Sequence, residues 1–235
     1  IKGAIVASPV FCLGEVFSAA TPALFLAKIA GLSVSSAMIC SVAADDLYFA
    51  LSEQLSLKGI QVRRFTTATT TPILNAYTHP ETLGSDRLAD AVGAWSLFPH
   101  QHSFVIDCGS CLNYELVASE GIYLGGGISP GLQIRLKAMH DYTGKLPLLN
   151  ASDYTGLFPG KTTKDSMLSA TIGGMIAEIE ALIEKIEKKY TPLNIILAGG
   201  DASFFGKYLK NKNFAHPDLV LTGLAQTLKY HFETK

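Results

Sequence analysis

The stretch Phe104-Val-Ile-Asp-Cys-Gly-Ser110 lies near the middle of the chain and predicts a short buried strand that runs straight into a turn. Leu112–Val117 predicts the returning strand, so the turn joins a β-hairpin. Such a turn can present the Asp107 carboxylate, the Ser110 hydroxyl and free backbone N–H groups to a phosphate or its cation. Aspartate and glycine also occur in hairpins simply because they suit turns, so the hairpin alone leaves both interpretations open.

Predicted strands and predicted helices alternate on either side of this hairpin. Strands are predicted at Ile1–Ala7, Ser36–Ser41, Ile60–Phe65, Ile122–Leu124 and Asn194–Ala198. Helices are predicted at Pro22–Ala30, Asp45–Leu57, from an N-cap at Ser85 or Asp86 to Trp95, and at Leu132–Tyr142, Thr163–Tyr190 and Leu224–Phe232. Strands that alternate with helices are typical of the α/β class. Pro99-His-Gln-His102 interrupts the chain before the central strand, and we place a boundary there between domains 1–100 and 101–235.

Apolar stripes mark the inward faces of two helices. In the helix Asp45–Leu57 the stripe consists of Leu47, Leu51 and Leu55 at helical spacing. In the helix that begins at Thr163 the stripe consists of Ile176, Ile179, Ile183, Ile186 and Tyr190. This second stripe is too short for a coiled coil by itself, so core packing is the favoured interpretation and a contact with a second subunit is the alternative.

The composition indicates a folded chain with a sizeable core. Of its 235 residues, 48% are hydrophobic and 17% are charged, which argues against disorder. The formal net charge is -1 and no block of basic residues occurs, so we expect neither a nucleic-acid surface nor an anionic-membrane surface. The apolar run Ile29–Ala44 has 16 residues with four serines, which is too short and too polar to span a membrane. No basic region followed by an apolar core opens the chain, so no signal peptide is expected.

Four cysteines occur, at Cys12, Cys40, Cys108 and Cys111. Cys108 and Cys111 have the spacing of a redox or zinc motif. Against a zinc site, no second pair of this spacing occurs, and no histidine except His102 lies near at the spacing of a metal ligand. The favoured interpretation is that they are reduced thiols that act as small apolar residues. Few cysteines without a disulfide framework indicate the cytoplasm.

Four glycine-containing turns are candidates for binding a ligand. They are Gly84-Ser-Asp-Arg87, Asp107-Cys-Gly-Ser110, Gly125-Gly-Gly-Ile-Ser-Pro-Gly131 and Gly199-Gly-Asp201. The second and fourth follow predicted buried strands, where glycine lets a ligand approach the backbone closely, and they make Gly109, Ser110, Gly199 and Gly200 candidate nucleotide contacts. The third joins a strand to a helix, whose N-terminal N–H groups can hold an anion. None is a P-loop or a G-x-G-x-x-G motif and each alone is more often structural, but several together in an α/β chain indicate a nucleotide.

Asp86 and Arg87 are the more specific candidates for catalysis and anion binding. They follow the polar, threonine-rich segment Thr66–Thr82, which is predicted to be a surface loop. Asp86 can act as a general base toward an alcohol, and Arg87 can anchor an anion through its planar guanidinium. Phosphoryl transfer needs little more from a protein, because a carboxylate orients the hydroxyl while cations and N–H groups hold the phosphates. The alternative is a helix-capping carboxylate beside an exposed arginine.

The order of these motifs resembles the type III pantothenate kinase family. The motifs are Tyr77 with Gly84-Ser-Asp-Arg-Leu-Ala-Asp-Ala-Val92, then Val105-Ile-Asp-Cys-Gly-Ser110, Gly125-Gly-Gly-Ile-Ser-Pro-Gly131, Lys145-Leu-Pro147, Gly160-Lys-Thr-Thr163, Ile196-Leu-Ala-Gly-Gly200 and Leu219-Val-Leu-Thr-Gly-Leu224. The resemblance spans roughly residues 36 to 232. Each motif is short, whereas the ordered set with its spacing is specific.

This resemblance implies a fold and an activity. The fold would consist of two ribonuclease-H-like, actin-like domains with a nucleotide in the cleft between them. The activity would be ATP-dependent phosphorylation of the pantothenate hydroxyl, the first step of coenzyme A biosynthesis, in a cytoplasmic homodimer. Potassium or ammonium would be the activating monovalent cation, and magnesium would accompany ATP. Neither a nucleic acid nor a membrane is implied as a partner.

The resemblance also implies roles for individual residues. Asp86 matches the proton acceptor. The positions that match the pantothenate site are Tyr77, Gly84, Ser85, Asp86 and Arg87, and Thr163 matches a further substrate contact that reaches across the homodimer. Asp107 matches the ligand of the monovalent cation, and Ser110 matches an ATP contact.

The sequence departs from the family pattern in two ways. The family usually has threonine at the position of Ser110 and Asn-Thr at that of Thr162-Thr163, and because both changes keep a hydroxyl we expect binding to be retained. The family also opens with a strand and an Asp-x-Gly-Asn-Thr phosphate loop, and Ile1-Lys-Gly-Ala-Ile-Val6 resembles the strand after that loop. We therefore expect the first phosphate loop upstream of residue 1, and the alternative is a protein that lacks this loop and is inactive. The alternative function is that of a non-catalytic, nucleotide-binding relative that acts as an accessory or regulatory factor.

Overall fold

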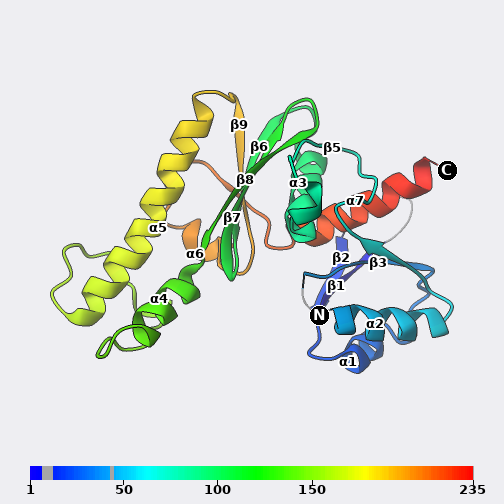
Figure 1. The fold of residues 1–235 in the computed structure, drawn as a ribbon, viewed down its shortest axis with the longest axis horizontal. Coiled ribbons are helices and arrows are strands. Elements are labelled where there is room, and N and C mark those ends of the chain that lie inside the picture. The colour runs from blue at the N-terminus through cyan, green and yellow to red at the C-terminus, as the bar shows by residue number, and fades with distance from the viewer. Residues whose placement is uncertain (7–12, 43–44, 235) are drawn as a thin grey trace. The chain divides into compact units, whose positions relative to one another are not determined.

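The structure is a computed structural model that describes residues 1–6, 13–42 and 45–234 (Figure 1). Ala7, at the end of the predicted first strand, and Cys12 lie outside the described residues. The chain forms two compact units, which are described separately below. Unit 1 consists of Ile1–Pro99, Gly121–Tyr123 and Leu219–Lys235, and unit 2 consists of His100–Glu120 and Leu124–Asp218. The predicted domains, 1–100 and 101–235, differ from these units at His100, which belongs to unit 2, and at residues 121–123 and 219–235, which belong to unit 1.

The sheet of unit 2 is built around the strand that holds Asp107. Its strands are β6 (His102–Cys108), β7 (Cys111–Ala118), β8 (Ile122–Pro130), β9 (Leu193–Ala198) and β10 (Phe214–Ala215). Their spatial order is β10-β9-β6-β7-β8, with β7 antiparallel to β6, and with β9 parallel to both β6 and β10. Numbered by their order in the chain and read from β8 to β10, the strands follow the order 3-2-1-4-5, the arrangement of a ribonuclease-H-like domain. The α/β class is confirmed, and Phe104–Ile106 are buried as the apolar run predicted.

Helices α4 (Leu132–Asp141), α5 (Thr163–Glu187) and α6 (Ala202–Phe205) belong to the same unit, with the short 3-10 helix η2 (Ala151–Asp153) between α4 and α5. The α5 stripe packs into the core, since Ile179 and Ile183 are fully buried and the other predicted stripe residues lie against the same cluster. Helix α5 is also the one helix in the described part of the chain that is long and apolar enough to cross a membrane by length and composition. Its packing in the unit 2 core accounts for that apolar character.

The N-terminal part of unit 1 contains two separate strand pairs. Strands β1 (Lys2–Val6) and β2 (Leu13–Ser18) are antiparallel, and β3 (Ser36–Cys40) and β4 (Gln61–Phe65) are parallel. Helices α1 (Pro22–Lys28) and α2 (Asp45–Leu57) are both present where the sequence predicted a helix, although α1 ends two residues before the predicted Ala30. Strand β2 lies in a segment for which the sequence predicts neither a strand nor a helix. Leu51 and Leu55 are buried as expected, but Leu47 is 40% exposed, so its inward placement was wrong.

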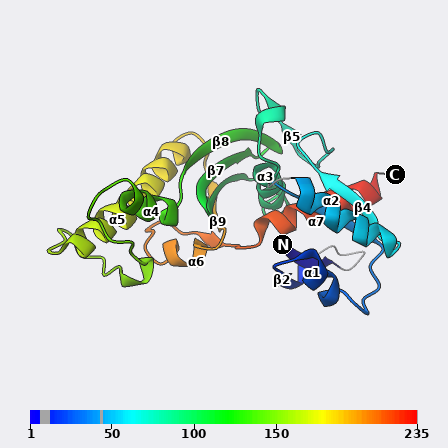
Figure 2. The ribbon, with the colours of Figure 1, turned by 60° about the horizontal axis from the view of Figure 1, so that its bottom comes forward.

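Two helices from distant parts of the sequence complete unit 1. Helix α3 (Ser85–Leu97) lies beside α7 (Leu219–Glu233), which begins five residues before the predicted Leu224 (Figures 1 and 2). A side chain at Gly93 would collide with Leu219, and one at Gly223 would collide with the Ala89 backbone. The two helix backbones are therefore in close contact. The predicted loop Thr66–Thr82 contains β5 (Leu74–Asn75) and the 3-10 helix η1 (Pro80–Thr82), and β5 pairs in parallel with the start of β8.

Candidate active site

One group of candidate residues lies in unit 1, at the N-terminus of α3. Gly84, with φ -62° and ψ 130°, is the N-cap and provides no side chain, whereas Ser85 and Asp86 lie in the first turn. The prediction that Ser85 or Asp86 is the N-cap was therefore wrong. The Oδ1 atom of Asp86 accepts a hydrogen bond of 2.9 Å from the Arg87 N–H, and a Cβ at position 84 would lie only 2.6 Å from that oxygen. The absence of a side chain at Gly84 thus makes room for the Asp86 carboxylate.

Arg87 and Tyr77 lie together in the same unit. The Arg87 side chain is buried, with its Cζ atom 5.9 Å from the centroid of the Tyr77 ring. The sequence interpretation of an exposed arginine is therefore wrong. Tyr77 donates its backbone N–H to Oδ1 of Asn75 at 3.0 Å. Asn75 was not among the predicted site residues, and only its place two residues before Tyr77 could have pointed to it.

Cys40 also contacts this part of the site. It ends β3, and its Sγ atom lies 3.2 Å from the Ser85 hydroxyl, within hydrogen-bonding distance. Burial, opposed by the Ser85 hydrogen bond and assisted by Asp86 and Asp90, raises the pKa of the Cys40 thiol to about 11. Cys40 is therefore a neutral thiol at neutral pH. From the sequence, Cys40 is expected only to be a small apolar residue, because β3 and α3 are separated by more than 40 residues and their contact is tertiary.

A separate group of candidate residues lies in unit 2, where β6 turns into β7. The Gly109 N–H donates to the Cys111 carbonyl at 3.0 Å, and the Gly131 N–H donates to the Ser110 carbonyl at 3.1 Å. These bonds fix a tight turn with an exposed Ser110 beside the start of α4. The glycine run Gly125–Gly127 lies within β8 rather than in a loop before α4, so only Gly131 stands at the helix N-terminus.

The Gly199 turn lies directly beside Asp107. Gly199 has φ +79°, a conformation that favours glycine, and a Cβ there would collide with Oδ1 of Asp107 and the Cys108 carbonyl. The Asp201 N–H donates to the Cys108 carbonyl at 2.9 Å, and burial raises the pKa of the Asp201 carboxyl. The structure thus groups five predicted residues of unit 2, namely Asp107, Gly109, Ser110, Gly199 and Gly200. Asp201 was not predicted, although it directly follows the predicted glycine pair.

The residues around Asp107 can be tested for their fit to a cation. Within the described residues no group of three His, Cys, Asp or Glu side chains is placed to hold a metal. Oδ1 of Asp107 is buried in the cradle that Gly199 leaves open. One carboxylate among backbone carbonyls suits a hard cation that takes its other oxygen ligands from carbonyls, water or phosphate. The turn therefore fits such a cation and does not form a metal cage of side chains.

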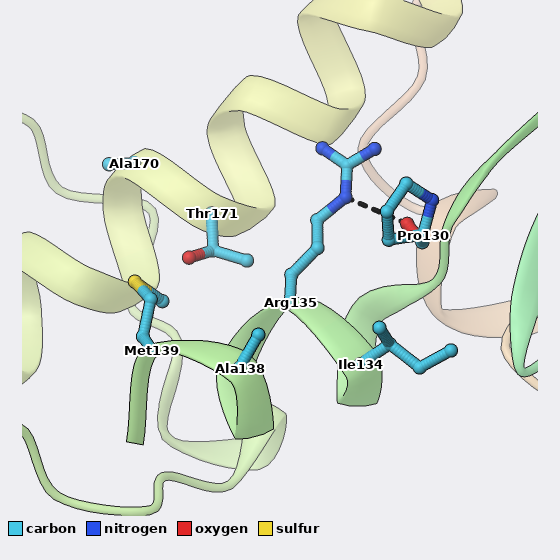
Figure 3. A pocket seen from close by; sticks show the side chains of 7 residues that line it. All are labelled: Pro130, Ile134, Arg135, Ala138, Met139, Ala170 and Thr171. Carbon is cyan, nitrogen blue, oxygen red and sulfur yellow. Dashed lines mark hydrogen bonds between the residues drawn. The ribbon is translucent and has the colours of Figure 1, made fainter. Parts of the chain in front are cut away.

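Two other features of unit 2 lie outside this grouping. Thr163 is the exposed first residue of α5, and its neighbour Thr162 caps the helix by accepting the Asp165 N–H at 3.1 Å. Thr163 belongs to unit 2, whereas the other predicted pantothenate contacts belong to unit 1. A cavity of about 390 Å³ lies between α4 and α5 (Figure 3). Its lining contains none of the predicted site residues and consists of Pro130, Ile134, Arg135, Ala138, Met139, Ala170 and Thr171.

Comparison with known proteins assigns the family. The sequence model described as type III pantothenate kinase matches residues 18–185. The chain belongs to the type III pantothenate kinase family. Curated proteins of that name include one from Flavobacterium johnsoniae, 39% identical over 75% of this chain and 72% of the relative. Another, from Bacteroides fragilis, is 42% identical over 79% of this chain and 76% of the relative.

The match does not extend over the whole of every relative. The type III pantothenate kinase of Porphyromonas gingivalis is 44% identical over 155 residues, which are 64% of this chain and 62% of that protein. This chain therefore spans less than two thirds of the length of that curated relative. A solved structure from Campylobacter jejuni, described as a Baf family transcriptional activator, has a TM-score of 0.58 and 17% identity and covers 93% of this chain and 91% of its own. At that identity the likeness concerns the fold alone.

Proposed function

We propose that this protein catalyses the ATP-dependent phosphorylation of pantothenate on its hydroxyl group, the first step of coenzyme A biosynthesis. The observation that carries the proposal is the Asp86 carboxylate at the start of α3, inside the stretch that matches the family. Its Oδ1 is held by the Arg87 N–H, and within the described residues no hydrogen bond engages Oδ2. The curated relatives named pantothenate kinases do not favour the accessory-factor alternative.

In this reaction the pantothenate hydroxyl oxygen attacks the γ-phosphorus of ATP. A new oxygen–phosphorus bond forms, the bond from the γ-phosphorus to the bridging oxygen breaks, and ADP leaves with that electron pair. Asp86 accepts the proton of the attacking hydroxyl as general base. Arg87 contributes positive charge to the substrate site, and Tyr77, Gly84 and Ser85 complete it in unit 1.

ATP is assigned to the turns around Asp107. Ser110 supplies an exposed hydroxyl, and the glycines at 109, 199 and 200 let phosphate oxygens approach the backbone. We assign a monovalent cation, potassium or ammonium, to Asp107, and magnesium to the ATP phosphates. These cations would offset the negative charge that develops on the transferred phosphoryl group.

We also propose a cytoplasmic homodimer in which Thr163 reaches the acceptor site of the partner subunit. Thr163 is exposed at the start of α5. Exposed apolar side chains in unit 2 supply surface for a subunit contact, and they include Ile128, Ile134, Tyr142 and Phe158. Light scattering after size-exclusion chromatography measures the mass that decides between monomer and dimer.

The test of the proposed function is ADP release by the full-length protein with pantothenate, with and without potassium. We expect pantothenate-dependent turnover that potassium stimulates, and a loss of kcat of about 10²- to 10⁴-fold in Asp86→Asn, because the amide cannot accept the proton. Asp46→Asn is the matched control, since Asp46 is an exposed acidic residue in the first turn of α2. Unchanged kcat in Asp86→Asn would remove Asp86 from its role, and a full-length protein without pantothenate-dependent turnover would refute the function.

A further inference from the structure

Tyr123 lies in a short segment that joins unit 1 although its sequence neighbours belong to unit 2. The backbone of this segment pairs with β5, where Tyr123 stands opposite Asn75. The Leu74 N–H donates to the Gly121 carbonyl at 2.8 Å, and the Ala76 N–H donates to the Tyr123 carbonyl at 3.0 Å. The start of β8 therefore anchors the chain just before Tyr77.

The Tyr123 side chain is fully buried, and its ring lies against Tyr77. The two rings are nearly parallel, with an interplanar angle of 12° and centroids 6.2 Å apart, within the range of favourable offset stacking. The Tyr77 ring in turn lies 5.9 Å from the Arg87 guanidinium, within the range of a cation–π contact. A line of contacts therefore runs from Tyr123 through Tyr77 to Arg87.

The Tyr77 backbone is restrained as well. Oδ1 of Asn75 accepts its N–H at 3.0 Å, and Asn75 is the residue paired with Tyr123 across the strands. Tyr123 thus acts on Tyr77 in two ways, through the ring and through the strand that positions Asn75. Both ways order the Tyr77 side chain before a substrate binds, which lowers the conformational cost of binding.

We propose that Tyr123 is a positioning residue for the acceptor-substrate site. Tyr123 holds Tyr77, and through Tyr77 it holds Arg87, in the orientation that receives pantothenate. This proposal rests on the proposed function. Tyr123 itself does not act on the substrate, so its replacement should affect substrate binding more than the chemical step. The stacking requires the ring and not the hydroxyl, so phenylalanine should substitute for tyrosine here.

The experiment compares Tyr123→Leu and Tyr123→Phe with the wild-type protein. In Tyr123→Leu we expect the pantothenate KM to rise about two- to tenfold, which corresponds to the loss of one aromatic pair, while kcat and the ATP KM stay within about twofold. Tyr123→Phe should restore the wild-type KM. Phe17→Leu is the matched control, because Phe17 is also a buried ring packed on a second ring in unit 1, and it should leave the pantothenate KM unchanged.

A second readout does not depend on catalysis. Hydrogen exchange of the Tyr77 amide should become about tenfold faster in Tyr123→Leu and stay at the wild-type rate in Tyr123→Phe. In the wild-type protein, nuclear Overhauser effects should connect the rings of Tyr77 and Tyr123, a measurement that remains possible if the leucine variant does not fold. A missing ring-to-ring effect, a wild-type KM in folded Tyr123→Leu, or a phenylalanine variant as impaired as leucine would overturn the proposal. If the rings are in contact and exchange responds, but no protein turns over pantothenate, the proposed function fails instead.

Discussion

Two glycines leave space for two candidate carboxylates, one in each unit. A Cβ at Gly84 would lie 2.6 Å from Oδ1 of Asp86, and one at Gly199 would collide with Oδ1 of Asp107. Gly199 also has φ +79°, which disfavours other residues. At both positions the need for glycine arises from a carboxylate that occupies the space of a side chain. The glycine turns that the sequence singled out are therefore tied to Asp86 and Asp107.

The contact between Cys40 and Ser85 leads to a prediction for a single side chain. Cys40→Ala removes the group 3.2 Å from the Ser85 hydroxyl and should raise the pantothenate KM about two- to fivefold, because one weak hydrogen bond is lost. Cys40→Ser keeps a hydrogen-bonding group and should remain within about twofold of wild type. Steady-state kinetics with varied pantothenate measures both. Equal KM values for the alanine variant and the wild type would show that the contact does not position Ser85.

A polar network links elements of unit 2 near the cavity of Figure 3. Glu178 on α5 accepts hydrogen bonds from the Tyr114 hydroxyl of β7 at 2.8 Å and from Arg135 of α4 at 2.6 Å. Burial alone would raise the pKa of the Glu178 carboxyl, but the hydrogen bonds from Arg135 and Tyr114 and the Arg135 charge outweigh burial and lower it. Burial and the Glu178 hydrogen bond raise the pKa of the Tyr114 hydroxyl, so it stays protonated and donates.

This network predicts a stability that depends on pH. The folded-state pKa of Glu178 lies below its ordinary value of 4.5. The contribution of the ionised Glu178 carboxylate to the free energy of unfolding is therefore complete above pH 4.5, and it is lost as the pH falls through the folded-state pKa. Glu178→Gln should lower the free energy of unfolding by about 1–3 kcal/mol at neutral pH, with a smaller difference in acid. Urea denaturation at neutral pH and at acid pH measures this difference in the free energy of unfolding. Glu184→Gln, an exposed position on the same helix, should change little at either pH, and a Glu178→Gln effect that grows toward acid would contradict the assignment.

Across the whole molecule, unit 1 is completed by segments from distant parts of the chain. Helix α7, from the C-terminal end of the described residues, lies against α3 through close approaches at Gly93 and Gly223. Residues 121–123 enter the same unit from the middle of the sequence. Since the candidate catalytic residue Asp86 lies in the first turn of α3, the stability of the proposed acceptor site depends on these late segments.

Gly223→Ala tests this dependence. The new methyl group would collide with the Ala89 carbonyl oxygen, so the helices must separate, and we expect a loss of about 1–3 kcal/mol in the free energy of unfolding. Gly174→Ala in α5 is the matched control, because no atom lies within 4 Å of the added Cβ and alanine favours a helix, so it should stabilise by about 0.5–1 kcal/mol. Thermal and urea unfolding measure both variants. A Gly223→Ala protein as stable as wild type would mean that the two helices do not pack in backbone contact.

The sequence predicted the elements whose hydrophobic period is strong. The hairpin around Asp107, helix α2 and the core stripe of α5 follow from local patterns and are confirmed. It failed where contacts between distant segments decide the outcome. The exposure of Leu47, the β8 conformation of Gly125–Gly127 and the burial of Arg87 all depend on what packs against them. Strand β2 was missed because its short run carries glycine and glutamate between apolar residues.

For the site, the sequence by itself determined which residue types stand at the glycine turns and in which order, since both are local properties of the chain. That was sufficient to assign the family and to name Asp86 and Asp107. Only the tertiary structure decided that Gly199 leaves room for Asp107, that Cys40 contacts Ser85, and that Tyr123 stacks on Tyr77. The physical reason is that these contacts join residues more than 40 positions apart, and no local periodicity or turn preference encodes such a pair.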